Sequence, residues 1–312
     1  MSAIYKGHII DTDLSRAAMG GTEQMRQRLI DNVDSTLLEN VAIHCSRVRT
    51  FYDNVPNIFW AHDLVNDSEN DVLKNGGWAK FDAFVFVTCW QRDQYIDIFS
   101  IPYSKRTVIE NAIEPAFEKT IKKSSPIKLI YHTTPHRGLE LLYPVYEKLS
   151  RNMGDKVHLD VFSSFEIYGW KNRDERYAEL FEKLKPHPHI TYHGTQPNSV
   201  VREYLSQAHF FPYPCIWKET SCIALIEAIE HDVVAIHPNY GALPETAGQN
   251  TFMYQYTENH QDHANKMFMV LDALINGKVH TVAKMSQNPQ HNVITFRNKW
   301  NNLLRQVINE KR

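Results

Sequence analysis

The segment ETSCIALIEAIE contains two acidic side chains whose spacing suits ligand binding. Glu219 and Glu227 enclose seven residues, all apolar or small except Thr220 and Ser221. If a helix begins at Thr220, the two carboxylates lie about 12 Å apart along its axis. A carboxylate on an apolar helix needs hydrogen-bond partners, and sugar or ribose hydroxyls are suitable donors. The alternative is that Glu227 is structural and pairs with a neighbouring backbone or basic group.

The predicted start of this helix also favours anion binding. Thr220 and Ser221 are good N-caps. The first N–H groups of a helix have no intrahelical acceptor, and the helix dipole adds a partial positive charge there. We therefore expect phosphate or sugar oxygens to bind at this helix start.

A second polar cluster follows a predicted strand that ends near Tyr131. Thr133, Thr134, His136 and Arg137 occupy the turn before a predicted helix. Arg137 is placed to bind a phosphate bidentately, with nearby hydroxyl and N–H groups completing the site. The alternative is an ordinary surface arginine near a helix start.

Two features of the first third of the chain are weaker signals. Gly20 and Gly21 would let the backbone approach a ligand closely, but the full GxGxxG pattern and the P-loop lysine are absent, which argues against a standard dinucleotide site and a nucleotide triphosphatase. His62 directly follows a predicted strand, where it could contact an acceptor substrate or stabilise charge. With sixteen histidines in the chain, most are structural or simply exposed.

A metal site is not expected. Asp11, Thr12 and Asp13 form a DxD motif, which binds divalent cations in some nucleotide-sugar enzymes, but it also suits a turn or cap at the end of the first strand. The chain has no HExxH motif, no spaced Cys/His set and no GxSxG elbow. These absences disfavour zinc and serine hydrolases.

Strands and helices must position these residues. Apolar runs predict strands in the first third, and Met25, Leu29 and Val33 define one face of a helix between the first two. The predicted strands are residues 8–11, 41–45, 57–61, 83–88 and 107–110. The second series consists of strands 128–131, 157–163, 190–193, 210–213 and 233–236 and helices 138–150, 199–207 and 220–230.

Two such series imply two doubly wound α/β domains. We expect an N-terminal domain at 1–118, a linker at 119–126, a C-terminal domain at 127–290, and a terminal helix at 291–312 that packs back on the first domain. Two facing Rossmann-like halves would leave a cleft at the carboxyl ends of both sheets, where ligands of such folds bind.

Composition agrees with an ordinary globular protein. The 312 residues are 43% hydrophobic and 22% charged, with a net charge of −2, so no nucleic-acid partner is expected. No apolar run is long enough to span a bilayer, and the first residues lack the pattern of a secretory signal. We expect a cytoplasmic protein with four buried thiols, for which peripheral membrane contact stays open.

The chain resembles the retaining glycosyltransferases of family 4, which have the GT-B fold. ETSCIALIEA is similar to the E-x7-E signature of that family, and GALPETAG, GGTE, TPHRGLELL and the terminal helix resemble other family segments in the same order. TPHRGLELL carries Arg137 where the family normally has a lysine, and His132 stands where the family often has an arginine.

The resemblance implies a role for each matching residue. Arg137 and Gly21 would contact the donor diphosphate, Glu227 the ribose hydroxyls and Glu219 the donor sugar. The backbone of Thr220, Ser221 and Cys222 would bind sugar and phosphate oxygens, and His62 would lie near the reacting sugar.

The implied reaction is transfer of a sugar, with retained configuration, from a nucleotide diphosphate sugar to a hydroxyl on a glycan, lipid or small molecule. The nucleotide sugar is a co-substrate, and no cofactor or metal is expected. His132 supplies less certain positive charge than arginine, and the first domain is short for the family. A non-catalytic nucleotide-sugar-binding module and a GT-B nucleotide-sugar epimerase are therefore alternatives.

Overall fold

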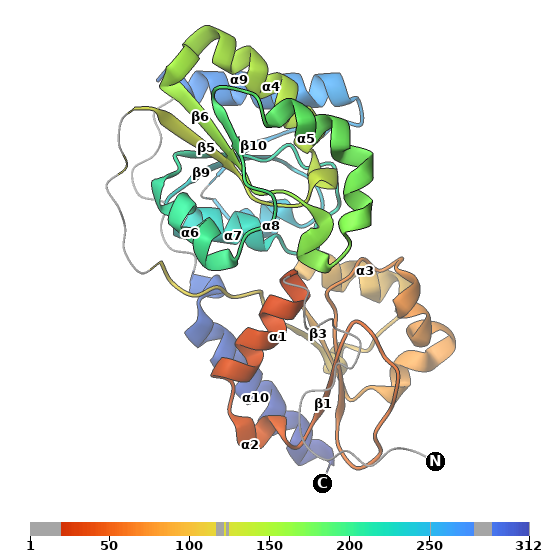
Figure 1. Cartoon of the computed structure of the whole chain (residues 1–312). Coiled ribbons are helices and arrows are strands. Elements are labelled where there is room, and N and C mark those ends of the chain that lie inside the picture. Colours follow the sequence, from red (N-terminus) through yellow and green to blue (C-terminus); the bar gives the residue numbers. More distant parts are fainter. Residues whose placement is uncertain (1–19, 117–121, 123–124, 250, 278–288, 312) are drawn as a thin grey trace. The chain divides into compact units, whose positions relative to one another are not determined.

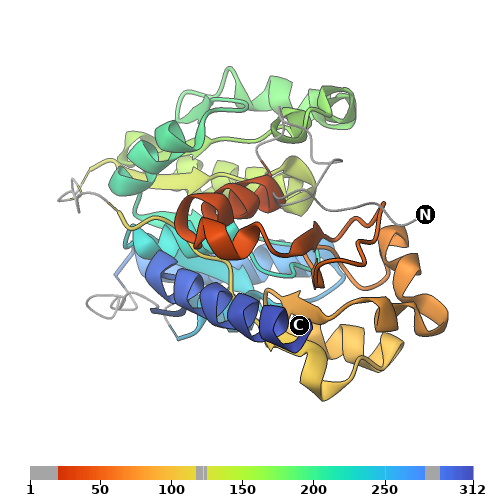
Figure 2. The same cartoon turned by 90° about the horizontal axis from the view of Figure 1, so that it is seen from below.

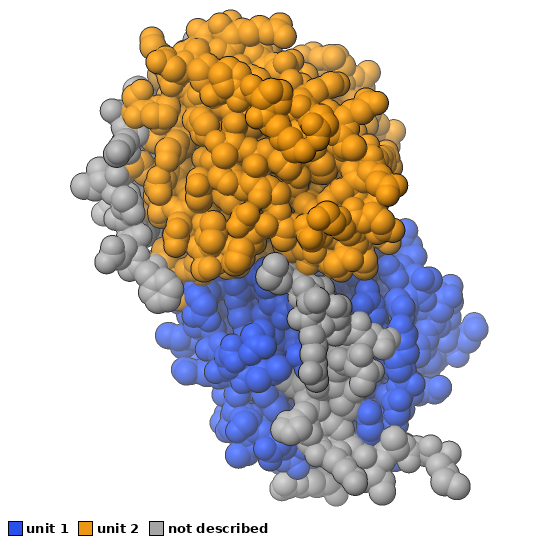
Figure 3. Space-filling view, viewed as in Figure 1, with its two compact units in different colours: residues 1–114, 289–312 blue, residues 115–288 orange. Residues whose placement is uncertain are grey.

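The computed structural model describes residues 20–116, 122, 125–249, 251–277 and 289–311. The chain divides into unit 1, residues 1–114 with 289–312, and unit 2, residues 115–288 (Figure 3). The predicted strand at 8–11, the DxD motif and most of the predicted linker lie outside the described residues.

Unit 1 contains a four-stranded parallel sheet with its strands in chain order. The first three strands are buried along their whole length, which explains why their sequences are apolar on both faces. The fourth strand forms an edge and is half-buried. The strands are β1 (Ala42–Cys45), β2 (Asn57–Trp60), β3 (Ala83–Phe86) and β4 (Arg106–Val108).

Helices cover both faces of this sheet. Consecutive side chains of a strand point to opposite faces, so one strand can pack on helices of both sides. Phe59 of β2 packs with Tyr95 of α3, whereas the next residue, Trp60, packs with Trp300 of α10. The helix α1 lies beside α10 in both ribbon views (Figures 1 and 2). The helices of unit 1 are α1 (Gly21–Asn32), α2 (Ser35–Leu38), α3 (Cys89–Phe99) and α10 (Val293–Lys311).

Unit 2 contains a six-stranded parallel sheet in the order β10-β9-β8-β5-β6-β7. The helices α4 and α9 pack together on one face, and α6 and α7 cover the other (Figure 1). The strands are β5 (Ile127–Tyr131), β6 (Val157–Val161), β7 (Ile190–Tyr192), β8 (Phe210–Pro212), β9 (Val234–Pro238) and β10 (Phe252–Tyr254). The helices are α4 (Leu139–Met153), α5 (Ala178–Leu184), α6 (Asn198–Gln207), α7 (Ile223–Glu230), α8 (Leu243–Ala247) and α9 (His260–Ile275).

The sequence missed several of these elements. It did not predict α3, α5, α8, α9 or β10. In α3 the buried positions are Gln91, Tyr95 and Phe99, so the inward stripe contains a polar residue. Gln91 is accommodated because its amide donates to the Asp63 carbonyl and accepts from the Val87 amide.

The cysteines depart from expectation at one position. Cys45, Cys215 and Cys222 are buried as expected. Cys89 is exposed, because the residue after the N-cap of α3 faces away from the sheet.

Candidate functional site

The sheet of unit 2 has a point where its winding reverses. β5 and β8 are neighbours in the sheet, with Leu129 paired to Phe210, yet the chain continues from β5 toward β6 and from β8 toward β9 on opposite sides. Loops that leave such a pair diverge and open a crevice, which is where open α/β sheets bind their ligands. The two polar clusters of the sequence follow these two strands.

The loop after β5 is packed against the loop after β8. A 3-10 turn, Pro135–Arg137, leads to Gly138, whose φ of +110° lies in the left-handed region. A Cβ atom at Gly138 would lie 2.1 Å from the carbonyl oxygen of Pro214. Glycine is therefore required here both for its backbone conformation and for the close approach of the loops.

Arg137 and Glu219 form an ion pair within this arrangement. The Arg137 Nη1 atom donates to Glu219 Oε1, and the Tyr213 hydroxyl donates to the same oxygen over 2.5 Å. Arg137 Nε also donates to Thr134 Oγ1 over 3.2 Å. The Glu219 side chain is 6% exposed and that of Arg137 is 18% exposed, so neither charge is well solvated. The structure thus brings together three predicted site residues, Thr134, Arg137 and Glu219, while Thr133 lies half-buried beside them.

The main chain of Glu219 is held by the GALPETAG segment. The Ala242 amide donates to the Glu219 carbonyl over 2.9 Å. Gly241 has a φ of +58°, and a Cβ atom there would lie 2.9 Å from the Glu219 amide nitrogen. The close approach of these two segments fixes the position of the carboxylate.

The predicted helix start at Thr220 is wrong. The helix α7 begins at Ile223, with Cys222 as its N-cap and no side-chain cap hydrogen bond. Thr220 and Ser221 lie in the loop before it, so the estimated 12 Å helical separation of Glu219 and Glu227 does not apply. Burial raises the pKa of the Cys222 thiol well above its ordinary value, so this side chain stays protonated.

Glu227 lies on α7 and is 3% exposed. Its Oε1 atom accepts a hydrogen bond of 2.9 Å from Nδ2 of Asn198, the first residue of α6. The Glu227 carboxylate therefore has a structural partner in Asn198, as the alternative interpretation requires. Its role in holding ribose hydroxyls stays a prediction.

Five buried polar atoms without partners lie on the loops that follow strands of unit 2. They comprise two ring nitrogens and three hydroxyl oxygens that make no hydrogen bond to any described residue. Unsatisfied buried polar atoms are rare in native proteins and often mark a place where a ligand or water completes the site. These atoms are Nδ1 of His132 and His136, Oγ of Ser163 and Ser221, and Oγ1 of Thr195.

An aromatic group next to the ion pair escaped the sequence analysis. The His136 ring stacks on Phe165, with centroids 5.1 Å apart, and contacts the edge of Trp217 at 5.0 Å. Trp217 is 45% exposed, which is unusual for so large an apolar side chain. The signal in the sequence that could have predicted a site role for Trp217 is its position two residues before Glu219.

His132 supplies no positive charge to the site at neutral pH. Its Nε2 atom lies 3.0 Å from the Ala224 carbonyl oxygen, and its ring packs on Phe211. Burial lowers the pKa of His132 to about 4. The position at which the resemblance predicts an arginine therefore holds a neutral ring.

The pKa of His132 predicts a loss of stability in acid. The unfolded chain protonates this histidine near pH 6.5, whereas the folded chain does so only near pH 4. The stabilisation is present above pH 6.5 and is lost as the pH falls toward 4, because the unfolded state then binds more protons. In urea unfolding at pH 7 and pH 5, we expect the wild-type protein to lose about 2 kcal/mol more than His132→Gln. Equal losses in the two proteins would contradict this assignment.

Three predicted residues belong to unit 1. Gly20 is the N-cap of α1 and Gly21 its first residue; the φ of Gly20 is −70°, which does not require glycine. His62 follows β2, and its backbone amide donates to Ser46 Oγ over 2.7 Å. Burial lowers the pKa of His62 to about 3, so the ring is neutral. Their relation to the residues of unit 2 stays a prediction.

Among the described residues, no three His, Cys, Asp or Glu side chains form a group suited to a metal ion. In addition, none of the described helices combines the length and hydropathy needed to cross a membrane.

Comparison with known proteins now places the chain in a class. Two parallel α/β sheets and the structural neighbours described below confirm the α/β, GT-B fold class expected from the sequence. Residues 113–287 match the family model of glycosyl transferases group 1. The chain belongs to this family. A search of curated proteins finds no match.

The similar solved structures share little sequence with the chain. A glycosyltransferase from Rickettsia africae ESF-5 has 15% identity and a TM-score of 0.64, over 97% of this chain and 83% of its own. HepE from Anabaena, in complex with UDP-glucose, has 12% identity and a TM-score of 0.64, over 89% of this chain and 82% of its own. TarM has 16% identity and a TM-score of 0.60, over 85% of this chain. The chain spans 54% of the length of TarM.

Proposed function

We propose that the chain is a retaining glycosyltransferase of family 4 that transfers a sugar from a nucleotide diphosphate sugar to a hydroxyl group. The observation that carries this proposal is the position of Arg137 and Glu219 on the two loops that leave the switch point of the unit 2 sheet. The unpartnered polar atoms on the neighbouring loops support it, because a ligand rich in hydroxyl and phosphate oxygens would satisfy them.

Arg137 would stabilise the leaving diphosphate. Its Nη1 and Nε atoms bond to Glu219 and Thr134, whereas its Nη2 atom makes no hydrogen bond to the described residues. Glu219 therefore orients the guanidinium while leaving donors for phosphate oxygens. Fixed donors of this kind stabilise developing charge electrostatically, and the proposed reaction needs no metal ion.

The remaining roles follow the family resemblance. Glu227 would hold the ribose hydroxyls, Glu219 the donor sugar, and the backbone at residues 220–222 the sugar and phosphate oxygens. Gly21 would approach the diphosphate. His62 would act near the reacting sugar as a neutral hydrogen-bonding group rather than as a cation, because of its low pKa.

The proposed transfer retains the anomeric configuration. The bond from the anomeric carbon to the diphosphate oxygen breaks, the bond to the acceptor oxygen forms on the same face, and the departing phosphate takes the acceptor proton. No protein nucleophile is needed, so Glu219 positions rather than attacks. Water would compete as acceptor, which makes hydrolysis the expected side reaction.

A panel of nucleotide sugars tests the proposal. UDP-glucose is the first choice, since the solved structure of HepE contains it. We expect release of the nucleoside diphosphate with at least one donor, and an α-linked product from an α-linked donor by NMR. The absence of binding and of release with every donor would refute the proposal.

The same products separate the two alternatives. A non-catalytic module would bind a nucleotide sugar and leave it unchanged, and an epimerase would release an isomerised sugar. The neutral state of His132 is the observation that favours a non-catalytic module, because the proposed diphosphate site then has one cation fewer.

Ser221→Ala separates donor binding from stability. Ser221 Oγ is buried and has no partner among the described residues, so its removal should leave the free energy of unfolding unchanged or raise it by up to about 1 kcal/mol. If the hydroxyl binds the donor, affinity measured by calorimetry should fall roughly three- to tenfold.

Ser150→Ala is the matched control. Ser150 is buried on α4, and its hydroxyl donates to the Glu147 carbonyl over 3.1 Å. This variant should lose stability and keep donor affinity. A Ser221→Ala protein with unchanged donor affinity would show that its hydroxyl does not contact the donor.

A further inference from the structure

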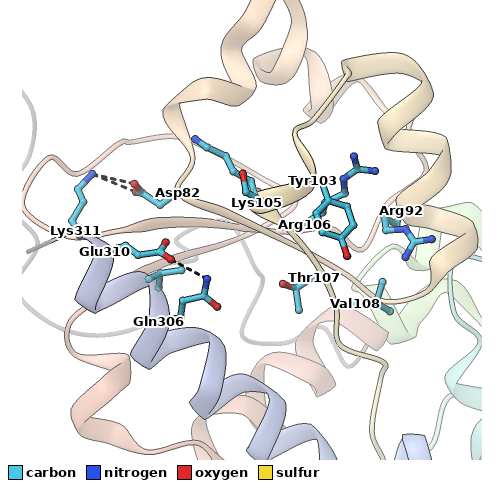
Figure 4. A pocket seen from close by; sticks show the side chains of 12 residues that line it. Asp82, Arg92, Tyr103, Lys105, Arg106, Thr107, Val108, Gln306, Glu310 and Lys311 are labelled. Carbon is cyan, nitrogen blue, oxygen red and sulfur yellow. Dashed lines mark hydrogen bonds and ion pairs between the residues drawn. The ribbon is translucent and has the colours of Figure 1, made fainter.

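A groove in unit 1 runs along the edge strand β4, and its lining includes none of the predicted site residues. It has a volume of about 820 Å³ and is lined by residues of β4, the preceding turn and the end of α10 (Figure 4). Thr107 of β4 and Gln306 of α10 lie on one side, and Tyr103 and Arg106 lie on the other. This division follows from the alternation of side chains along a strand.

The outer edge of β4 offers unused backbone groups to this groove. The Ile109 amide donates to the Phe86 carbonyl over 2.9 Å, so residues 107 and 109 direct their backbone groups toward β3. Arg106 and Val108 consequently direct theirs away from β3. The Arg106 amide donates a hydrogen bond to the Tyr103 carbonyl within the chain. The Val108 N–H and C=O have no partner in the described part of the chain.

The groove is also positively charged. Its lining includes the cations Arg92, Lys105, Arg106 and Lys311 and the acids Asp82 and Glu310, a net charge of +2. Asp82 pairs with Lys311 at one end. At the other end Arg92 pairs with Asp93, which does not line the groove, so the uncompensated charge there is that of Arg106 (Figure 4).

Arg106 is the least satisfied of these cations. Its guanidinium lies 5.3 Å from the ring centre of Tyr103, which is 85% exposed. Its Nε atom is buried and makes no hydrogen bond to the described residues. Charged residues on an edge strand often only prevent unwanted pairing by staying solvated. The buried, unpartnered Nε atom of Arg106 does not fit this protective role, because its burial costs desolvation free energy that no hydrogen bond offsets.

We propose that β4 binds an acidic peptide as an additional strand. The peptide backbone would pair with Val108 and with the Arg106 carbonyl, and alternate acidic side chains on the Arg106 side would accept from the guanidinium. Main-chain pairing at a sheet edge supplies affinity, and the alternate side chains supply specificity. This proposal does not depend on the glycosyltransferase reaction.

A fluorescent peptide in which glutamate alternates with threonine is the probe. We expect saturable binding to the full chain in fluorescence anisotropy at low salt. Replacing glutamate by lysine, or methylating the backbone nitrogens that face β4, should abolish it. Arg106→Ala should weaken binding roughly tenfold, which corresponds to one charge-assisted hydrogen bond.

Arg305→Ala is the matched control, since Arg305 is exposed on α10 and does not line the groove. It should keep peptide affinity. Circular dichroism of both variants reports whether unit 1 is folded.

Other outcomes would overturn the proposal. No saturable binding by the wild-type protein, or equal binding of the methylated peptide, excludes strand addition. Binding of inorganic polyphosphate but not of the peptide, lost in Arg106→Ala, would identify a phosphate site instead. Self-association of Arg106→Ala, with no peptide binding to the wild type, would show that Arg106 only protects the edge.

Discussion

Arg137→Ala should lose both donor binding and stability. Removal of the guanidinium leaves the Glu219 carboxylate buried, with only the Tyr213 hydroxyl still donating to its Oε1 atom. Breaking a buried pair from one side costs about 3 kcal/mol, because the remaining charge is left without its counterion. Donor affinity should fall on the order of a hundredfold, since the proposed contact of Arg137 with the donor diphosphate would be lost. Urea unfolding and calorimetric titration measure the two effects.

A double variant separates the two losses. In Arg137→Met with Glu219→Gln, both charges are absent and the side-chain volumes are nearly kept. We expect stability to return to within about 1 kcal/mol of wild type, since neutral replacements of buried pairs are often tolerated. Donor binding should stay lost. A double variant that binds donor as tightly as the wild type would remove Arg137 from the diphosphate site.

Gly138→Ala should have a similarly large effect through packing alone. The new Cβ atom would lie 2.1 Å from the Pro214 carbonyl oxygen, and the backbone at φ +110° is strained for any other residue. The loops after β5 and β8 would have to separate, which moves Arg137 from Glu219. We expect a stability loss of about 3 kcal/mol and a clear fall in donor affinity.

Gly154→Ala is the matched control on the same helix. Gly154 lies at the other end of α4 and also has a positive φ, +60°, but a Cβ atom there meets no atom within 4 Å. This variant should cost about 1–3 kcal/mol, because φ +60° with ψ −132° is a backbone conformation that only glycine adopts readily, and it should keep donor affinity. If the two alanine variants lose equal stability and both bind donor normally, the close approach at Gly138 is not what holds the site.

Strong local patterns were read correctly from the sequence. The apolar runs at 57–61 and 83–88 became β2 and β3, because residues buried on both faces of a parallel sheet must be apolar throughout. The helix α3 was missed because its inward stripe includes Gln91, a polar residue whose side chain bonds to the nearby Val87 amide and to the Asp63 carbonyl, which is distant in the sequence.

The boundaries of the site were less predictable. Thr220 and Ser221 are good N-caps by type, yet α7 begins at Ile223. The loop before it is instead held by the Ala242 amide, which bonds to the Glu219 carbonyl. A tertiary contact of this kind outweighs a capping preference of about 1 kcal/mol.

The sequence by itself determined the kinds of chemistry available: a cation after one strand, two acids around an apolar helix, and two series of parallel strands. Residue types and local periodicity suffice for this, because they govern burial and charge. Only the tertiary structure decided that Arg137 meets Glu219, that His132 is neutral and that Arg106 lies in a groove. Those facts depend on strand order and on the burial of side chains from distant segments, which no local pattern encodes.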